Sequence, residues 1–136
     1  MIQPYKQGAA LVEEIRVTRP GSQEIAVWWL GQSGFLIKGR EVVMVIDPYL
    51  SESLTTKYAG TTKPHIRMTA APLRGEDLTE VDWVLVSHKH SDHLDPETTP
   101  ALLNASPRAK LILPASLVEH ARGLGVDPRR MRPLDA

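Results

Sequence analysis

The sequence of 136 residues contains no cysteine. Disulfide bonds, thiolate ligands for a metal ion and a cysteine nucleophile are therefore all excluded. Any metal ion that the protein binds must be held by nitrogen and oxygen ligands, which argues against a structural zinc finger.

An excess of charge of one sign is also absent. The 16 basic and 16 acidic residues give a formal net charge of zero, and the sequence contains no block of like charge. A nucleic-acid partner and a membrane-surface patch both need a local surplus of Lys and Arg. We therefore expect neither nucleic acid nor a membrane as a partner.

Long hydrophobic runs are missing too. Residues 1–18 mix charged with apolar side chains and lack the apolar centre of a secretory signal. The apolar stretches Ala26–Leu30 and Val42–Ile46 are too short to span a bilayer. These features predict a cytoplasmic protein. With 42% hydrophobic residues, the composition is that of an ordinary globular domain.

The first part of the chain predicts one helix followed by three strands. Residues Gly8–Val17 have apolar side chains at helical spacing and charged side chains opposite them, which is typical of an amphipathic helix. The three predicted strands cover residues 25–30, 35–38 and 41–47. Because Gly-containing turns join them, an antiparallel meander is expected.

The second part predicts alternating strands and helices, and hence an α/β fold. Residues 48–80 are predicted to be mostly loop, and a loop of this length in a compact domain is usually functional. The strands are expected at 81–87, 111–113 and from 131, and the helices at 96–105 and 114–124. We divide the chain into an amino-terminal extension, residues 1–22, and a domain over residues 23–136.

Three of the five histidines, His88, His90 and His93, fall within six residues, together with Asp92. In an extended segment alternate side chains share one side, so His88 and His90 can bind one cation together. Asp92 and His93 then reach a neighbouring position as the chain turns. Imidazole and carboxylate groups suit Zn, Mn or Fe, and the pattern indicates half of a two-metal site. The alternative is a polar surface loop, in which imidazoles would repel one another without a cation.

The segment His88-Lys89-His90-Ser91-Asp92-His93 resembles the HxHxDH signature of the metallo-β-lactamase superfamily. The segments Trp28–Phe35, Val45–Pro48 and Val81–His88 are similar to its L-ascorbate-6-phosphate lactonase-like branch. The resemblance runs from about Ile25 to the last residue and implies the amino-terminal half of an αββα sandwich. The signature is specific for fold and metal binding, but much less so for the substrate.

The resemblance implies one or two divalent metal ions, Zn or Mn, with Fe as a further option. His88 and His90 would bind the first ion, and Asp92 and His93 the second. Asp92 would also be catalytic, because it would orient a hydroxide and take a proton during attack. Asp47 looks like the buried acid that braces the site from behind. The alternative for Asp47 is a turn carboxylate beside Pro48.

The function that this resemblance implies is metal-dependent hydrolysis. Opening of a lactone by a metal-bound hydroxide is the first hypothesis. A phosphodiesterase or nuclease on the same fold is one alternative. Another is a catalytically incomplete metal-binding fragment, because relatives carry further His and Asp ligands downstream. We expect an anionic small molecule as substrate, and a homo-oligomer because half a sandwich exposes apolar surface.

Several weaker candidates lie outside the histidine cluster. His65 and His120 are not expected to replace the missing ligands. Lys63, His65 and Arg67 are either receptors for an anionic substrate or parts of an ordinary solvated loop, with Arg67 a weak substrate candidate. The adjacent Trp28 and Trp29 are expected to pack in the core rather than line a pocket.

Overall fold

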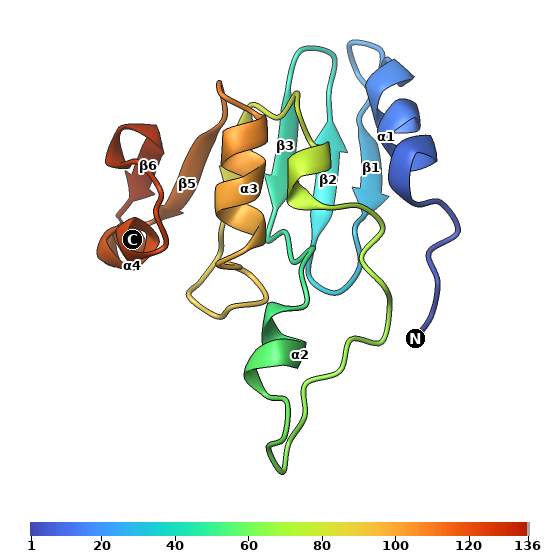
Figure 1. Cartoon of the computed structure of the whole chain (residues 1–136). Helices are drawn as coiled ribbons and strands as arrows, with labels where there is room; N and C mark the ends of the chain where they lie inside the picture. The colour runs from blue at the N-terminus through green and yellow to red at the C-terminus, as the bar shows by residue number, and fades with distance from the viewer. Residues whose placement is uncertain (136) are drawn as a thin grey trace.

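The computed structural model describes residues 1–135 (Figure 1). The elements in chain order are α1 (Gly8–Val17), β1 (Ala26–Trp29), β2 (Phe35–Lys38), β3 (Val43–Ile46), α2 (Ser53–Lys57), the single 3-10 turn η1 (Gly75–Asp77), β4 (Trp83–Leu85), α3 (Thr98–Ala105), β5 (Lys110–Pro114), η2 (Ala115–Leu117), α4 (Val118–Gly123), η3 (Pro128–Arg130) and β6 (Met131–Leu134).

The six strands form one sheet in the order in which they occur along the chain. Strands β1, β2 and β3 pair antiparallel, which confirms the predicted meander. Strands β3, β4, β5 and β6 pair parallel, because longer connections with helical segments carry the chain back to the same edge before each new strand. The α/β class predicted from the sequence is confirmed.

The two faces of the sheet have different surroundings. Helices α1 and α3 lie over one face (Figure 1). On that face Leu36, Val45, Val84 and Leu111 are fully buried, each 0% exposed, and full burial of one such side chain stabilises the fold by about 1.5–3 kcal/mol. A helical layer on a single sheet corresponds to half of the predicted αββα sandwich.

The other face, which we call the open face, is apolar, and within residues 1–135 no helix lies over it (Figure 1). Strand register aligns Trp29 with Phe35, Phe35 with Ile46, and Ile46 with Leu85. Val27, on the same side of β1, is 52% exposed, while Trp29 is 56% and Phe35 40% exposed. We define the open face by these five residues.

The adjacent tryptophans on β1 point to opposite sides of the sheet, since side chains alternate along a strand. Trp28 is half-buried beneath α1, where its indole N–H donates to the Glu14 carboxylate at 3.0 Å. The Trp29 indole N–H donates to the carbonyl of Gln32 at 3.1 Å. The prediction that both rings belong to the core is therefore wrong for Trp29.

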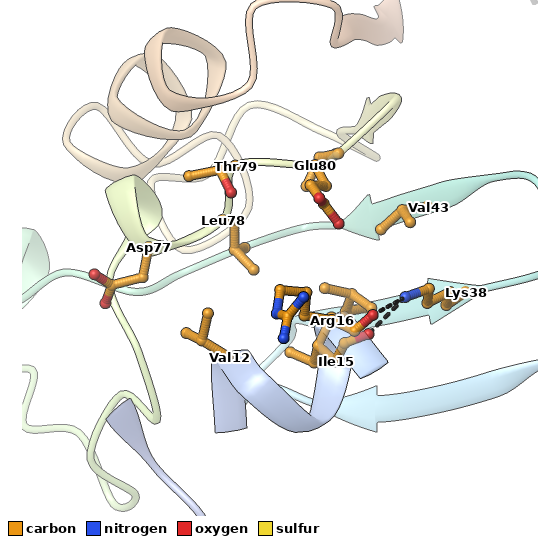
Figure 2. Close-up of a pocket in the computed structure, with 11 residues that line it drawn as sticks. Val12, Ile15, Arg16, Lys38, Val43, Asp77, Leu78, Thr79 and Glu80 are labelled. Atoms are coloured by element: carbon orange, nitrogen blue, oxygen red, sulfur yellow. Dashed lines mark hydrogen bonds between the residues drawn. The ribbon is translucent and has the colours of Figure 1, made fainter. Parts of the chain in front are cut away.

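Helix α1 is fastened to the sheet by Lys38 at the end of β2 (Figure 2). The Lys38 ammonium donates to the carbonyl oxygens of Ile15 and Arg16 at 2.6 and 3.2 Å. The last carbonyls of a helix lack partners within it, and a cation suits this negative end of the helix dipole. Burial lowers the pKa of the Lys38 amine. Lys38 thus fixes the orientation of α1 over the buried face.

The predicted long loop consists mostly of irregular backbone and contains two short elements, α2 and η1. Its start and end are both buried at the sheet, through Tyr49 and Leu73. Between them the chain extends away from the sheet (Figure 1). Within residues 1–135, no helix combines the length and the apolar character that a membrane crossing needs.

Candidate metal centre

The histidine cluster occupies the loop between β4 and α3, at the edge of the sheet where β3, β4 and β5 end. Val86 and Leu94 anchor the two ends of this loop, with exposed fractions of 2% and 1%. The backbone N–H groups of His93 and Leu94 both donate to the carbonyl of His90, at 2.9 and 2.8 Å. This tight turn brings the later residues of the cluster back towards the earlier ones.

Asp95 ties the end of the loop to α3. Its carboxylate is fully buried and accepts hydrogen bonds from the N–H groups of Glu97 and Thr98, each at 3.3 Å. The helix begins at Thr98, two residues later than predicted, but Asp95 still satisfies its first N–H groups. The Ser53 hydroxyl also donates to Asp95, at 2.8 Å, and this bond connects α2 to the loop.

Asp47, directly after β3, lies beneath the cluster. One carboxylate oxygen accepts from the Ser87 N–H at 2.7 Å, and the other from the Ser87 hydroxyl at 2.6 Å. The second oxygen also lies 2.9 Å from His93 Nδ1. Burial raises the pKa of Asp47, but the hydrogen bonds from Ser87 and His93 outweigh it, so the pKa is lowered. Asp47 is therefore an ionised acceptor at neutral pH.

These hydrogen bonds select the tautomers of two histidines. His93 donates its Nδ1 proton to Asp47, so Nε2 keeps its lone pair. Because the Ser87 hydroxyl proton goes to Asp47, the Ser87 oxygen accepts from His88 Nδ1, which lies 3.0 Å away. His88 Nε2 is then also a free lone pair. Fixing one ring nitrogen in this way is how proteins prepare the other to bind a metal ion.

The donor atoms of the cluster form two pairs. His88 Nε2 lies 3.0 Å from His90 Nδ1. Two ligands of one tetrahedral zinc ion, each at roughly 2.0–2.1 Å, are about 3.3 Å apart, so this pair fits a shared ion. The second pair is His93 Nε2 and Asp92 Oδ2, which are 3.8 Å apart.

Neither pair has a third side chain beside it that could bind the same ion, within the residues that the structure describes. Within residues 1–135, no three His, Asp or Glu side chains are arranged to hold one ion. On the predicted assignment, each of two neighbouring metal ions would have two ligands from this loop. Catalytic zinc sites usually have three protein ligands, which is one more than either pair offers.

A cleft with a volume of about 590 Å³ opens beside this cluster. We call it the lysine cleft, and its lining residues are Leu54, Lys57, Tyr58, Lys63, His65, Lys89, His90, Ser91, Asp92 and His120. It thus includes His90 and Asp92 from the predicted ligands. His120, which was expected at the surface, and His65, which was considered either a receptor for an anionic substrate or a solvated loop residue, both contribute to its wall.

Arg67 has a different position from the one expected of a substrate-binding residue. Its side chain is buried, with an exposed fraction of 1%, and its guanidinium donates to the carbonyls of Tyr49, Ser51 and Thr69. It also stacks on the Tyr49 ring, 4.4 Å from the centroid. The sequence hypothesis for Arg67 is thereby corrected: inside the fold, this cation connects the start of the long loop, at Tyr49 and Ser51, to Thr69.

Two serines that contact the cluster were not predicted from the sequence. Ser87 hydrogen-bonds to Asp47 and to His88, and its position directly before the signature could have indicated this role. The Ser33 hydroxyl donates to the backbone carbonyl of Asp92 at 2.6 Å. Ser33 lies in the turn between β1 and β2, distant in sequence, so no local pattern indicates this contact.

Comparison with known proteins identifies the family to which the sequence and the fold are similar. The family described as "Beta-lactamase superfamily domain" matches residues 26–130. N-acyl-phosphatidylethanolamine-hydrolyzing phospholipase D 1 of Caenorhabditis elegans is 31% identical over 99 residues, which are 72% of this chain and 27% of that protein. A probable L-ascorbate-6-phosphate lactonase of Escherichia coli O127:H6 is 27% identical over 140 residues, covering 90% of this chain and 40% of the lactonase.

Among solved structures, Igni18, a metallo hydrolase from the archaeon Ignicoccus hospitalis, superposes with a TM-score of 0.50 at 17% identity, covering 81% of this chain and 39% of Igni18. This likeness concerns the fold. The chain spans less than half the length of each of these proteins. The family match covers most of the chain and includes both the Asp47 position and the histidine loop, and the chain therefore belongs to the metallo-β-lactamase superfamily.

Proposed function

We propose that this chain provides metal ligands and a catalytic carboxylate to a metal-dependent hydrolase. His88 and His90 would hold one divalent ion, and Asp92 and His93 a second. The carrying observation is the close approach of two ring nitrogens, His88 Nε2 and His90 Nδ1, which are 3.0 Å apart. This separation suits two nitrogen ligands of one ion, and in the metal-free chain a proton on one of the two nitrogens takes the place of the cation.

Zn and Mn are the first candidates for the metal, with Fe as a further option, because imidazole and carboxylate ligands suit all three. When bound, such ions polarise a carbonyl or phosphoryl oxygen and lower the pKa of water. The protein's own groups then determine the geometry. Asp92 accepts a proton from the attacking water, and Ser33 holds the backbone of Asp92 in place.

Hydrolysis of a lactone is the first choice of reaction. The similarity to the probable L-ascorbate-6-phosphate lactonase supports it, since that match extends over 90% of this chain. Phosphodiester hydrolysis is the second choice, supported by the similarity to the phospholipase D of Caenorhabditis elegans. Both relatives are named for substrates that contain phosphate, which is compatible with an anionic substrate.

Metal binding is tested first, by calorimetric titration of Zn and Mn into the chelator-treated 136-residue chain. We expect His88→Ala and His93→Ala each to weaken binding by tenfold or more. Asp47→Asn should weaken it by about 10–100-fold, as is usual for partners of metal-ligating histidines. Glu41→Gln is the matched control for Asp47→Asn, because Glu41 is exposed and lies in the loop between β2 and β3. Unchanged affinity after replacement of all four ligands by Ala would refute the proposal.

The reaction is tested by supplying the metal-loaded chain with a phosphorylated sugar lactone and with bis(p-nitrophenyl) phosphate. Turnover of the first supports lactone hydrolysis, and preferential turnover of the second supports the phosphodiesterase. Metal binding without turnover of either supports the third hypothesis, a metal-binding fragment that lacks catalytic ligands. This last result would agree with the lack of a third ligand, since no three His, Asp or Glu side chains within residues 1–135 are arranged to hold one ion.

A further inference from the structure

The lysine cleft is positively charged, although the chain as a whole has no net charge. Three of the six lysines of the sequence, Lys57, Lys63 and Lys89, line it. Asp92 is the one carboxylate in its lining, and we have assigned that group to a metal ion. The complete chain has 16 basic and 16 acidic residues, so the positive charge of the cleft is local.

The three ammonium groups also lack counter-charges. Within the part of the chain that the structure describes, none of them forms an ion pair. The Lys57 ammonium lies over the face of the Tyr58 ring, 5.3 Å from its centroid. Lys6, in contrast, pairs with Glu14, and Lys38 is buried against backbone carbonyls. The cations of the cleft are therefore free to receive an anion.

Three separate segments bring these lysines together. Lys57 ends α2, Lys63 follows in the long loop, and Lys89 lies within the histidine loop. The volume of about 590 Å³ is within the range of roughly 300–1,000 Å³ that small-molecule sites occupy. Since His90 and Asp92 line the same cleft, an anion bound there would lie next to the reacting part of the substrate.

The turn between β1 and β2 fixes both walls of the cleft. Gln32 Nε2 lies 3.5 Å from His65 Nε2 on the long-loop side, and the neighbouring Ser33 holds the carbonyl of Asp92 on the metal side. Gln32 has a φ of +52°, a left-handed conformation that costs a non-glycine residue energy and is often retained at functional sites. The Thr55 hydroxyl donates to the His65 carbonyl at 3.0 Å and so connects α2 to the segment around His65.

We propose that Lys57, Lys63 and Lys89 form a subsite that binds a phosphate group of the substrate. This inference rests on the proposed function, because it assumes that the neighbouring cluster performs the hydrolysis. A phosphate monoester carries a charge of about −1.5 to −2 near neutral pH and three strong acceptor oxygens, which match several lysines better than a carboxylate does. Lysine binds phosphate as a point charge.

The test is titration of inorganic phosphate into the metal-free chain, followed by heteronuclear NMR. Lys57→Met and Lys63→Met should each weaken phosphate binding about tenfold, the effect of losing one hydrogen bond to a charged group. Lys6→Met is the control, because it makes the same charge change outside the cleft. Acetate should bind more weakly than phosphate. Equal phosphate affinity in the wild type, Lys57→Met and Lys63→Met, or an equal loss in Lys6→Met, would overturn the subsite.

Zn titration of the same variants separates the two proposals. If Lys57→Met and Lys63→Met lose phosphate but keep the metal affinity, the subsite is supported independently of the metal centre. If phosphate binding is absent while Zn binds, the subsite is refuted and the hydrolase proposal stands. Glycerol 3-phosphate and vesicles that contain phosphatidic acid then distinguish a soluble ester from a lipid headgroup as the source of the phosphate, and either would support the subsite.

Discussion

Asp47 combines two unfavourable features in one residue. Its backbone has a φ of +43°, a region in which non-glycine residues are uncommon and Asp and Asn are enriched. Its carboxylate is also buried beside the histidine loop. Three hydrogen bonds, two from Ser87 and one from His93, compensate for this burial. Asn at this position keeps the backbone preference and removes the charge, which makes Asp47→Asn an informative substitution.

Asp47 should make the stability of the metal-free protein depend on acid pH. The folded carboxylate has a lowered pKa, whereas an unfolded Asp titrates near about 3.9. Between these two values the unfolded chain binds more protons, so the free energy of unfolding rises with pH. The contribution of Asp47 is therefore present above its unfolded pKa and is lost as the pH falls through the folded pKa.

Urea unfolding between about pH 3 and 7 measures this effect. The difference in unfolding free energy between wild type and Asp47→Asn should be largest near neutral pH and should shrink below about pH 4. Glu41→Gln should show no comparable trend. A difference that stays constant over the whole pH range would mean that Asp47 acts through packing alone.

At the scale of elements, the contact between η1 and α3 leaves little space. An added Cβ at the buried Gly75 would lie 2.8 Å from the carbonyl oxygen of Thr98 and 3.3 Å from the N atom of Leu102. Both neighbours are backbone atoms of α3, which cannot move aside as a flexible side chain would. Glycine at position 75 therefore allows the long loop to return to the core directly against this helix.

Gly75→Ala should lower the free energy of unfolding by about 1–3 kcal/mol, the usual cost of overpacking. Gly123→Ala is the matched control, because a Cβ there meets nothing within 4 Å and the residue ends α4. It should be neutral or stabilise the protein by up to about 1 kcal/mol. Urea denaturation midpoints of the two variants give the comparison, and equal midpoints would contradict the steric explanation.

Regular elements were predictable from the sequence because periodicity and turn residues act locally. Helix α1 has the predicted bounds, Gly8–Val17, and β2 has the predicted Phe35–Lys38. The residues of the candidate metal centre could also be proposed from the sequence, since His88, His90, Asp92 and His93 share one short segment. The Ser33 contact and the burial of Arg67 depend on residues that are distant in sequence. The lysine cleft likewise needs the folded path of the long loop.

At the scale of the whole molecule, the open face exposes apolar side chains to solvent, which is unfavourable unless another surface covers them. Contiguous apolar patches on soluble proteins usually mark interaction sites, and this face carries Trp29 and Phe35 at 56% and 40% exposure. The chain has no net charge to oppose association. We therefore expect the 136-residue chain to form homo-oligomers, with a second copy packed against this face.

Sedimentation velocity at micromolar concentration tests this expectation. Trp29→Glu should shift the wild-type oligomer towards monomer, because it places a charge on the open face at one of its most exposed residues. Val17→Glu is the control, since Val17 is similarly exposed, at 51%, but ends helix α1. A monomeric wild type, or equal dissociation in both variants, would exclude the open face as the contact surface.

The turn between β1 and β2 has a consequence for how this protein can diversify. Through Gln32 and Ser33 it holds one wall of the cleft and one side of the metal centre separately. Insertions or deletions in the chain between α2 and His65 would then reshape the space available to a ligand while the coordinating loop kept its support. A descendant protein could therefore acquire a new substrate without any change in the residues of the candidate metal centre.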